Sequence, residues 1–197
     1  MNSRYTIHLV DDDEAVREGL SLLFEAHGFA VAAFRDSAHL LAEFDANNLG
    51  PLLIDLNMPQ VTGLELHTQL LQRGVEWPVI VITGDGDIHS CRAAFRSGVV
   101  DFLTKPIDEK DLFAALKKAE RALDTLRERD DARILLGRLT PREREILDLV
   151  CRGFGTKDIS SGLAISARTV DNHRANICDK LGTTSAVELL QIMQAAQ

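Results

Sequence analysis

The chain of 197 residues is long enough for one large domain or two small ones. With 45% apolar and 26% charged residues it has the composition of an ordinary globular protein, and no run approaches the roughly 18 apolar residues that a membrane span needs. The first residues, MNSRYTIHLVDDD, contain no apolar segment followed by a small-residue cleavage site, so we expect no secretion. Three widely spaced cysteines without a C-x-x-C motif predict buried thiols and a cytoplasmic location.

The net charge of −8 is unevenly distributed along the chain. Residues 1–121 hold eleven Lys and Arg against nineteen Asp and Glu, whereas residues 122–197 hold eleven of each. An acidic balance argues against nucleic-acid binding, because DNA-binding proteins neutralise phosphates with positive charge. Here all of the excess acidity belongs to the first part, so the second part can still contact phosphates.

Short apolar runs alternate with helical patterns through the first 121 residues. The predicted strands cover residues 5–10, 30–34, 51–55, 78–83 and 99–103. Segments of helical length separate them, and the third and fourth strands are almost wholly apolar, as expected of a parallel sheet covered on both faces. The pattern predicts an α/β fold with a five-stranded, doubly wound parallel sheet. Such sheets bind ligands beyond the carboxyl ends of their strands.

The rest of the chain is predicted to be helical. After Asp108 a helical pattern continues into the charged stretch RERDDAR, so residues 122–137 are interpreted as a helical linker. At Thr140 the pattern restarts with the capping-box sequence TPRE. The predicted helices of this last domain, residues 138–197, cover 141–152, 156–163, 167–181 and 185–196.

Acidic, hydroxyl and ammonium side chains that could bind a metal ion and a phosphoryl group lie where the predicted strands end. Asp11 and Asp12 follow the first strand, and Asp55 ends the third. Thr83 ends the fourth strand and Lys105 follows the fifth. All are expected at one edge of the sheet, where carboxylates suit Mg²⁺ and an aspartate can attack phosphorus. The next two acids, Asp13 and Glu14, are instead expected to cap the first helix and to interact favourably with its dipole.

Residues 4–121 resemble the receiver domains of bacterial two-component response regulators through the segments VDDDE, LLIDLNMPQVTGLEL, VIVITGDGD and DFLTKPI. The resemblance implies that Asp55 takes a phosphoryl group from the phosphohistidine of a cognate sensor histidine kinase. It also implies a Mg²⁺ (or Mn²⁺) cofactor. The implied metal ligands are Asp11, acting nearby or through water, Asp12, Asp55 and the backbone carbonyl of Asn57.

The same resemblance implies a switch. Thr83 and Lys105 would contact the phosphoryl group, Gly84 would leave room for the phosphodonor, and Phe102 would be the switch aromatic, filling the space that Thr83 leaves. The segment HSCRAAFRSGVVDF would repack and form the dimer surface of the active state. Pro106 is expected to follow a cis peptide bond.

The pattern LTPREREIL…G…TKDI…L.IS.RTV..HR.NI..KL resembles the LuxR-type helix-turn-helix, and with the receiver it is similar to the FixJ/NarL family, nearest the FixJ branch. This implies a scaffold helix at 156–163, a recognition helix at 167–181 in the major groove of DNA, and a helix at 185–196 that pairs two effector domains. Val170, Ile177 and Leu181 are interpreted as core. The implied DNA contacts are Thr156, Lys157, Ser166, Arg168, Thr169, Asp171, Asn172, Arg174, Asn176 and Lys180.

Asp171 departs from many relatives, which carry a basic residue at this position. An aspartate repels phosphate, yet it can accept a hydrogen bond from a cytosine amino group. Residues 138–197 hold eight Lys and Arg against seven Asp and Glu, so one domain is expected to bind DNA weakly, and two together specifically.

The sequence therefore favours a transcriptional response regulator rather than an enzyme. Phosphorylated on Asp55, it would dimerise, bind an inverted-repeat promoter and act with RNA polymerase, with activation the expected direction. One alternative is a Mg²⁺-dependent phosphohydrolase, which would need an acid–base aspartate where Asn57 stands. Another is a receiver that works without phosphorylation, or an effector that reads another ligand. The complete set of Asp, Thr and Lys residues argues against both.

Overall fold

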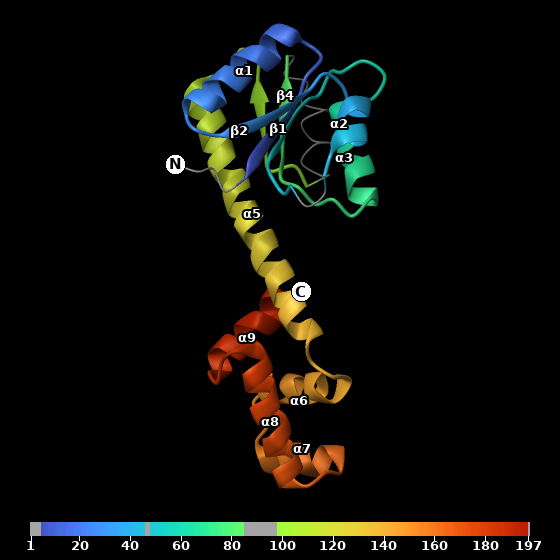
Figure 1. Ribbon diagram of the computed structural model, residues 1–197, viewed down its shortest axis with the longest axis vertical. Coiled ribbons are helices and arrows are strands. Elements are labelled where there is room, and N and C mark those ends of the chain that lie inside the picture. The colour runs from blue at the N-terminus through green and yellow to red at the C-terminus, as the bar shows by residue number, and fades with distance from the viewer. Residues whose placement is uncertain (1–4, 46–47, 85–97, 197) are drawn as a thin grey trace. The chain divides into compact units, whose positions relative to one another are not determined.

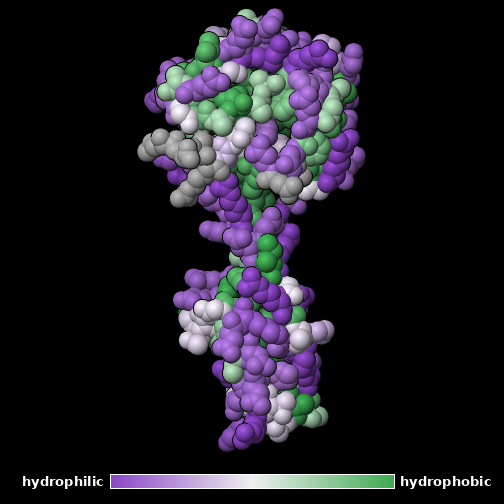
Figure 2. All heavy atoms as spheres, viewed as in Figure 1, coloured by the Kyte–Doolittle hydropathy of each residue, from purple (hydrophilic) through white to green (hydrophobic). Residues whose placement is uncertain are grey.

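The computed structural model describes residues 5–45, 48–84 and 98–196. The chain divides into two compact units, residues 1–124 and 125–197. Each unit has its own apolar core. The face seen in Figure 2 is mostly hydrophilic in both units.

The first unit is the predicted five-stranded parallel sheet, with the strand order β2-β1-β3-β4-β5. β3 and β4 are buried along their whole length, which confirms that both faces of the sheet are covered. Its strands are β1 (Thr6–Val10), β2 (Ala30–Phe34), β3 (Leu52–Asp55), β4 (Val79–Thr83) and β5 (Asp101–Thr104). Among the described residues of this unit, the helices are α1 (Glu14–Ala26), α2 (Ser37–Glu43), α3 (Gly63–Gln72) and the first part of α5 (Glu109–Gly137).

Helices cover the two faces of this sheet in pairs (Figure 1). α1 and α5 pack on one face, where Phe24 and Leu112 are fully buried against Ile80. α2 and α3 pack on the other, around Leu40 and Leu66. This two-sided burial holds the strand ends in place.

The start of α1 confirms the role predicted for Asp13. Its Oδ1 accepts hydrogen bonds from the backbone amides of Ala15, at 2.9 Å, and Val16, at 3.4 Å. Glu14 lies in the first turn of the helix, where the helix dipole favours a negative charge. These two acids therefore stabilise α1.

The second unit contains the end of α5 and four further helices. They are α6 (Pro141–Cys151), α7 (Thr156–Leu163), α8 (Ala167–Leu181) and α9 (Ala186–Ala195). The residues interpreted as a linker belong to α5, and the boundary between the units falls inside this helix. The predicted core positions Val170, Ile177 and Leu181 are buried, and Ser166 caps α8 by accepting a hydrogen bond from the Thr169 amide.

Two expectations need a correction or a limit. Cys151 and Cys178 are half-buried free thiols, because α6 and α8 leave them at the margin of the core, so the prediction of buried thiols was wrong for them. Cys91 and most of HSCRAAFRSGVVDF lie outside the described residues. Among the described helices, none combines the length and apolar character of a membrane span.

A partly buried ion pair joins α6 to α8. The Glu143 carboxylate accepts hydrogen bonds from the amide and hydroxyl of Thr140, which completes the predicted capping box. It also pairs with Lys180, whose Nζ lies 2.6 Å from Oε2, while only 4% of the Glu143 side chain is exposed. Hydrogen bonds from Lys180 and Thr140 lower the pKa of Glu143 to about 2.

This pair predicts a pH-dependent contribution to stability. Replacing Lys180 by Met leaves a buried carboxylate unpaired, so we expect the free energy of unfolding at pH 7 to fall by about 3 kcal/mol. Glu143 stabilises the fold above its unfolded pKa of 4.5, and this contribution is lost as pH falls toward about 2. The deficit of the variant should therefore shrink on acidification, as measured by urea unfolding at pH 7 and pH 4. The exposed Lys157→Met should cost little at either pH.

Candidate functional site

Three side chains from separate strands meet at the carboxyl edge of the sheet. The Lys105 ammonium lies 2.8 Å from Asp11 Oδ2 and 2.8 Å from Asp55 Oδ2. Asp11 is fully buried and Asp55 is 5% exposed. One cation thus bridges two buried carboxylates, as the convergence of the strand ends predicted.

Asp12 completes an acidic cluster with these two residues. Oxygen atoms of Asp11, Asp12 and Asp55 lie within 4.8 Å of one another. Asp12 is exposed while the other two are buried, so the cluster opens to solvent on its side. Carboxylate oxygens at this spacing fit a hard divalent cation that keeps some of its water ligands.

The pKa values of Asp11 and Lys105 are both raised, but for different reasons. Burial raises the pKa of Asp11, against hydrogen bonds from Lys105 and the Asp13 amide. Burial alone would lower the pKa of Lys105, but the hydrogen bonds that Lys105 donates to Asp11 and Asp55 outweigh this effect and raise its pKa. The ammonium therefore stays charged and offsets the repulsion between the carboxylates.

The other residues predicted at this edge lie around the cluster. The backbone amide of Asn57 donates a hydrogen bond to Asp55 Oδ1 at 3.1 Å, which holds that carboxylate in the turn after β3. Thr83 is buried at the end of β4, next to Gly84, and its carbonyl accepts a hydrogen bond from the Lys105 amide at 2.8 Å. The peptide bond between Lys105 and Pro106 is cis, as expected. Phe102 is half-buried in β5 and packs against the core on the side of α2 and α3.

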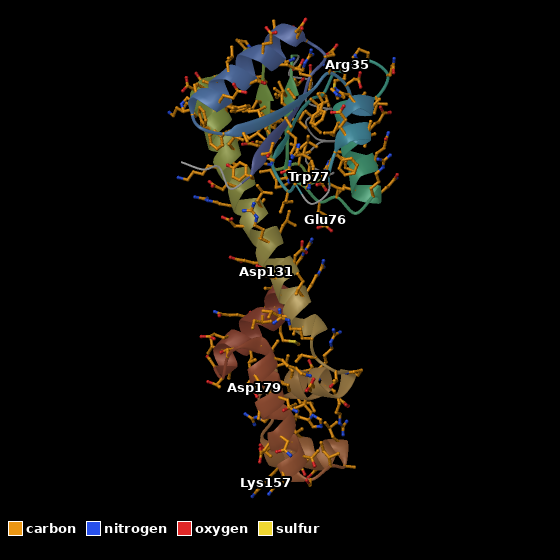
Figure 3. All side chains as sticks on the ribbon, in the orientation of Figure 1. Arg35, Glu76, Trp77, Asp131, Lys157 and Asp179 are labelled. Carbon is orange, nitrogen blue, oxygen red and sulfur yellow. The ribbon has the colours of Figure 1, made fainter. Side chains whose placement is uncertain are left out.

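Most of the predicted DNA contacts in the second unit lie in the first turns of α7 and α8, whereas Arg174, Asn176 and Lys180 lie farther along α8. Lys157, Arg168, Asp171, Asn172 and Asn176 are exposed. Figure 3 shows Lys157 at the end of this unit formed by α7, whereas Asp179 lies toward α9. The first turns of α8 and its scaffold helix thus present one polar surface.

Six of the predicted contacts have partners inside the protein. Ser166 caps α8, and its hydroxyl lies 2.8 Å from the Thr169 hydroxyl. Thr156 donates to Asp171 and accepts from Arg174. Lys180, in the last turn of α8, is paired with Glu143 of α6.

The comparisons with known proteins agree with this two-part construction. The family model of the response regulator receiver domain matches residues 7–117, and that of the luxR family of bacterial regulatory proteins matches residues 137–193. The transcriptional regulatory protein FixJ of Rhizobium meliloti is 36% identical over 195 residues, covering 97% of this chain and 96% of the relative. The chain belongs to the FixJ/NarL family of response regulators.

Other relatives support the same assignment. The tetrathionate response regulatory protein TtrR of Salmonella typhimurium is 36% identical over 186 residues, covering 94% of this chain and 90% of its own. The structure of the response regulator StyR matches with a TM-score of 0.75 and 34% identity over 98% of this chain and 99% of that one. Full-length FixJ of B. japonicum matches with a TM-score of 0.56 and 30% identity over 99% and 98%.

Membership of this family fixes the general role. A receiver and a LuxR-type DNA-binding domain in one chain make this response regulator a transcription regulator of a two-component system, with a sensor kinase as its upstream partner. Receiver domains bind Mg²⁺ at an acidic site, and the cluster around Asp55 provides such a site.

Two receiver residues were missed by the sequence reasoning. The Arg17 guanidinium donates to the backbone carbonyl of Asp11 at 2.8 Å and so fixes the loop that holds the acids. Gly63 lies against the backbone of Asp55, where an added Cβ would come within 2.6 Å of the Asp55 carbonyl oxygen. Both roles act through backbone atoms, so no side-chain pattern indicates them, although the capping sequence TGLE marks where α3 begins.

The bridge made by Lys105 predicts a stability effect. Replacing Lys105 by Gln leaves two buried carboxylates without a cation, so we expect the free energy of unfolding at pH 7 in a chelator to fall by roughly 2–4 kcal/mol. The pKa of Asp11, already raised by burial, should rise further, so that protonation restores stability as the pH falls below neutral.

Added Mg²⁺ should also reduce this deficit, because a divalent cation replaces the missing charge. The matched control is Lys118→Gln, since Lys118 pairs with Asp101 but is 56% exposed; it should change stability little. Equal losses for both variants, or a deficit insensitive to Mg²⁺ and pH, would contradict the bridging role. Urea unfolding of the full chain measures each case.

Proposed function

We propose that this response regulator is switched by phosphorylation of Asp55. The observation that carries the proposal is the bridge from Lys105 to Asp11 and Asp55, which places an ammonium beside the acceptor carboxylate. An Asp55 oxygen would attack the phosphorus of the kinase phosphohistidine, and the P–N bond to the imidazole would break as the acyl phosphate forms. Lys105 and the Thr83 hydroxyl would then bind the phosphoryl oxygens.

The acidic cluster supports a Mg²⁺ (or Mn²⁺) site within this mechanism. We propose that Asp11, Asp12, Asp55 and the Asn57 carbonyl hold the ion, which when bound neutralises charge on the phosphoryl group. The backbone amide of Asn57 orients the Asp55 carboxylate, and the Arg17 guanidinium holds the backbone carbonyl of Asp11. The protein side of the site is thus held ready for an incoming phosphodonor.

The receiver is proposed to catalyse only its own phosphorylation and slow dephosphorylation, and not to act as a phosphohydrolase. Hydrolytic turnover of phosphate esters would need an acid–base aspartate two positions after Asp55, and the residue there is Asn57, whose side-chain amide does not transfer a proton near pH 7. The acyl phosphate would therefore decay slowly and serve as a signal. The proposed movement of Thr83 and Phe102 would pass this signal to the segment 85–97, which lies outside the described residues.

We expect Asp55 to be the residue that accepts the phosphoryl group. Incubation with acetyl phosphate and Mg²⁺ should retard the wild-type chain in a phosphate-affinity gel, and Asp55→Asn should remove the shift, because the amide is not a nucleophile under these conditions. Asp13→Ser keeps a helix cap and should be phosphorylated normally.

Further outcomes separate the alternatives. A shift that survives Asp55→Asn would place the acceptor elsewhere, and no shift in the wild type would favour a receiver that works without phosphorylation. Continuous release of phosphate from small esters at many turnovers would instead favour the hydrolase.

We further propose that the phosphorylated form dimerises, binds an inverted-repeat promoter and acts with RNA polymerase, with activation as the direction. α9 supports pairing of the effector domains, because its inner face buries Leu189 while Val187 is 65% exposed and Leu190 is 38% exposed. The helical domain is nearly neutral, so paired domains supply the affinity that one lacks.

Val187→Glu tests this pairing surface. The variant should be phosphorylated like the wild type, while its binding to DNA in the presence of acetyl phosphate falls about tenfold or more, because the two domains no longer bind as one unit. Gln194→Glu adds the same charge elsewhere on α9 and should bind nearly normally. Unchanged binding by Val187→Glu, measured by fluorescence anisotropy, would exclude α9 as the pairing surface.

A further inference from the structure

An aspartate on the reading surface of α8 is held by a short chain of hydrogen bonds. Asp171 is exposed in the second turn of the helix, where a recognition helix contacts base edges. Its Oδ1 accepts a hydrogen bond from the Thr156 hydroxyl at 3.1 Å. Arg174 Nη1 donates to the same hydroxyl at 3.3 Å.

The direction of these bonds is fixed by the chemistry of the groups. A guanidinium only donates, so the Thr156 oxygen accepts from Arg174, and its single proton is left for Asp171. Thr156 and Arg174 are half-buried, whereas Asp171 is exposed. The hydrogen bonds therefore lead from the half-buried Arg174 through Thr156 to the exposed carboxylate of Asp171. Within the described residues Asp171 Oδ2 has no hydrogen-bond partner.

A carboxylate at this position lowers the affinity for DNA unless a base supplies a hydrogen-bond donor to it. It repels phosphates, and the helical domain has only one net positive charge to offset that repulsion. In the major groove, donors are the amino groups of cytosine and adenine. Adenine places its N7 acceptor beside the amino group, which a carboxylate also repels, so cytosine fits better.

We propose that Asp171 reads a cytosine in each half-site, with Thr156 and Arg174 as the residues that position its carboxylate. The proposal rests on the proposed DNA-binding function and names a base pair that this function requires. It also gives Arg174 a role behind the reading surface in place of a direct DNA contact. An acid here rejects half-sites that lack the amino donor, so it adds selectivity at the expense of general affinity.

The test is selection from double-stranded DNA with randomised positions, using the full chain with acetyl phosphate and Mg²⁺. The wild type should enrich two symmetric C·G pairs, with about a tenfold preference over the other bases at each. Asp171→Asn keeps an oxygen for Thr156 but presents an amide, so the preference at these positions alone should change to A·T.

Variants of Thr156 separate positioning from packing. Thr156→Val keeps the shape but removes the hydroxyl, and it should weaken the cytosine preference several-fold while other positions keep theirs. Thr156→Ser should restore the preference. A merely structural tie between α7 and α8 would instead lower affinity for all sequences alike.

The outcomes distinguish this inference from the proposed function. If the wild type selects a site but Asp171→Asn selects the same site, or if no cytosine is fixed, Asp171 does not read a base and the inference fails while DNA binding stands. If the phosphorylated wild type enriches no sequence, the proposed function fails and the inference fails with it.

Discussion

The receiver depends on one cation shared by two buried carboxylates. Asp11 follows β1 and Asp55 ends the adjacent strand β3, whereas Lys105 follows β5, with β4 in between. The lysine side chain must therefore reach across the end of β4, past Thr83, to place its ammonium between the acids. This geometry exists only when four strands are in register, so the chemistry of the site and the folding of the sheet cannot be separated.

The same constraint explains why the site was predictable. In a parallel sheet the strand ends share one edge, so acids and a lysine placed there by sequence must converge, and the structure brings Asp11, Asp55 and Lys105 together. The contacts of Arg17 and Gly63 were not predictable, because each involves a backbone carbonyl whose position only the finished fold defines. The periodicity of apolar residues predicts the helices and strands, but it does not predict these backbone contacts.

The ion pair of Lys180 shows a second kind of contact that sequence patterns do not predict. Helical spacing placed Lys180 outside the buried stripe of α8, which made it resemble a phosphate contact. Its partner Glu143 is 37 residues earlier and buried, and only tertiary packing brings the two together. A helical pattern reports which face is apolar, but it does not report which charges are used internally.

Acids held by donors recur in the chain, and burial separates what they can do. Glu143 is almost fully enclosed, so its charge serves only the fold. Asp55 is buried beside Lys105 but shares a cluster with the exposed Asp12, so a reactant can approach from one side. Asp171 is exposed, with one oxygen fixed by Thr156. A carboxylate that the protein orients but does not enclose retains the capacity to recognise a donor from outside, and this distinguishes a reading group from a structural one.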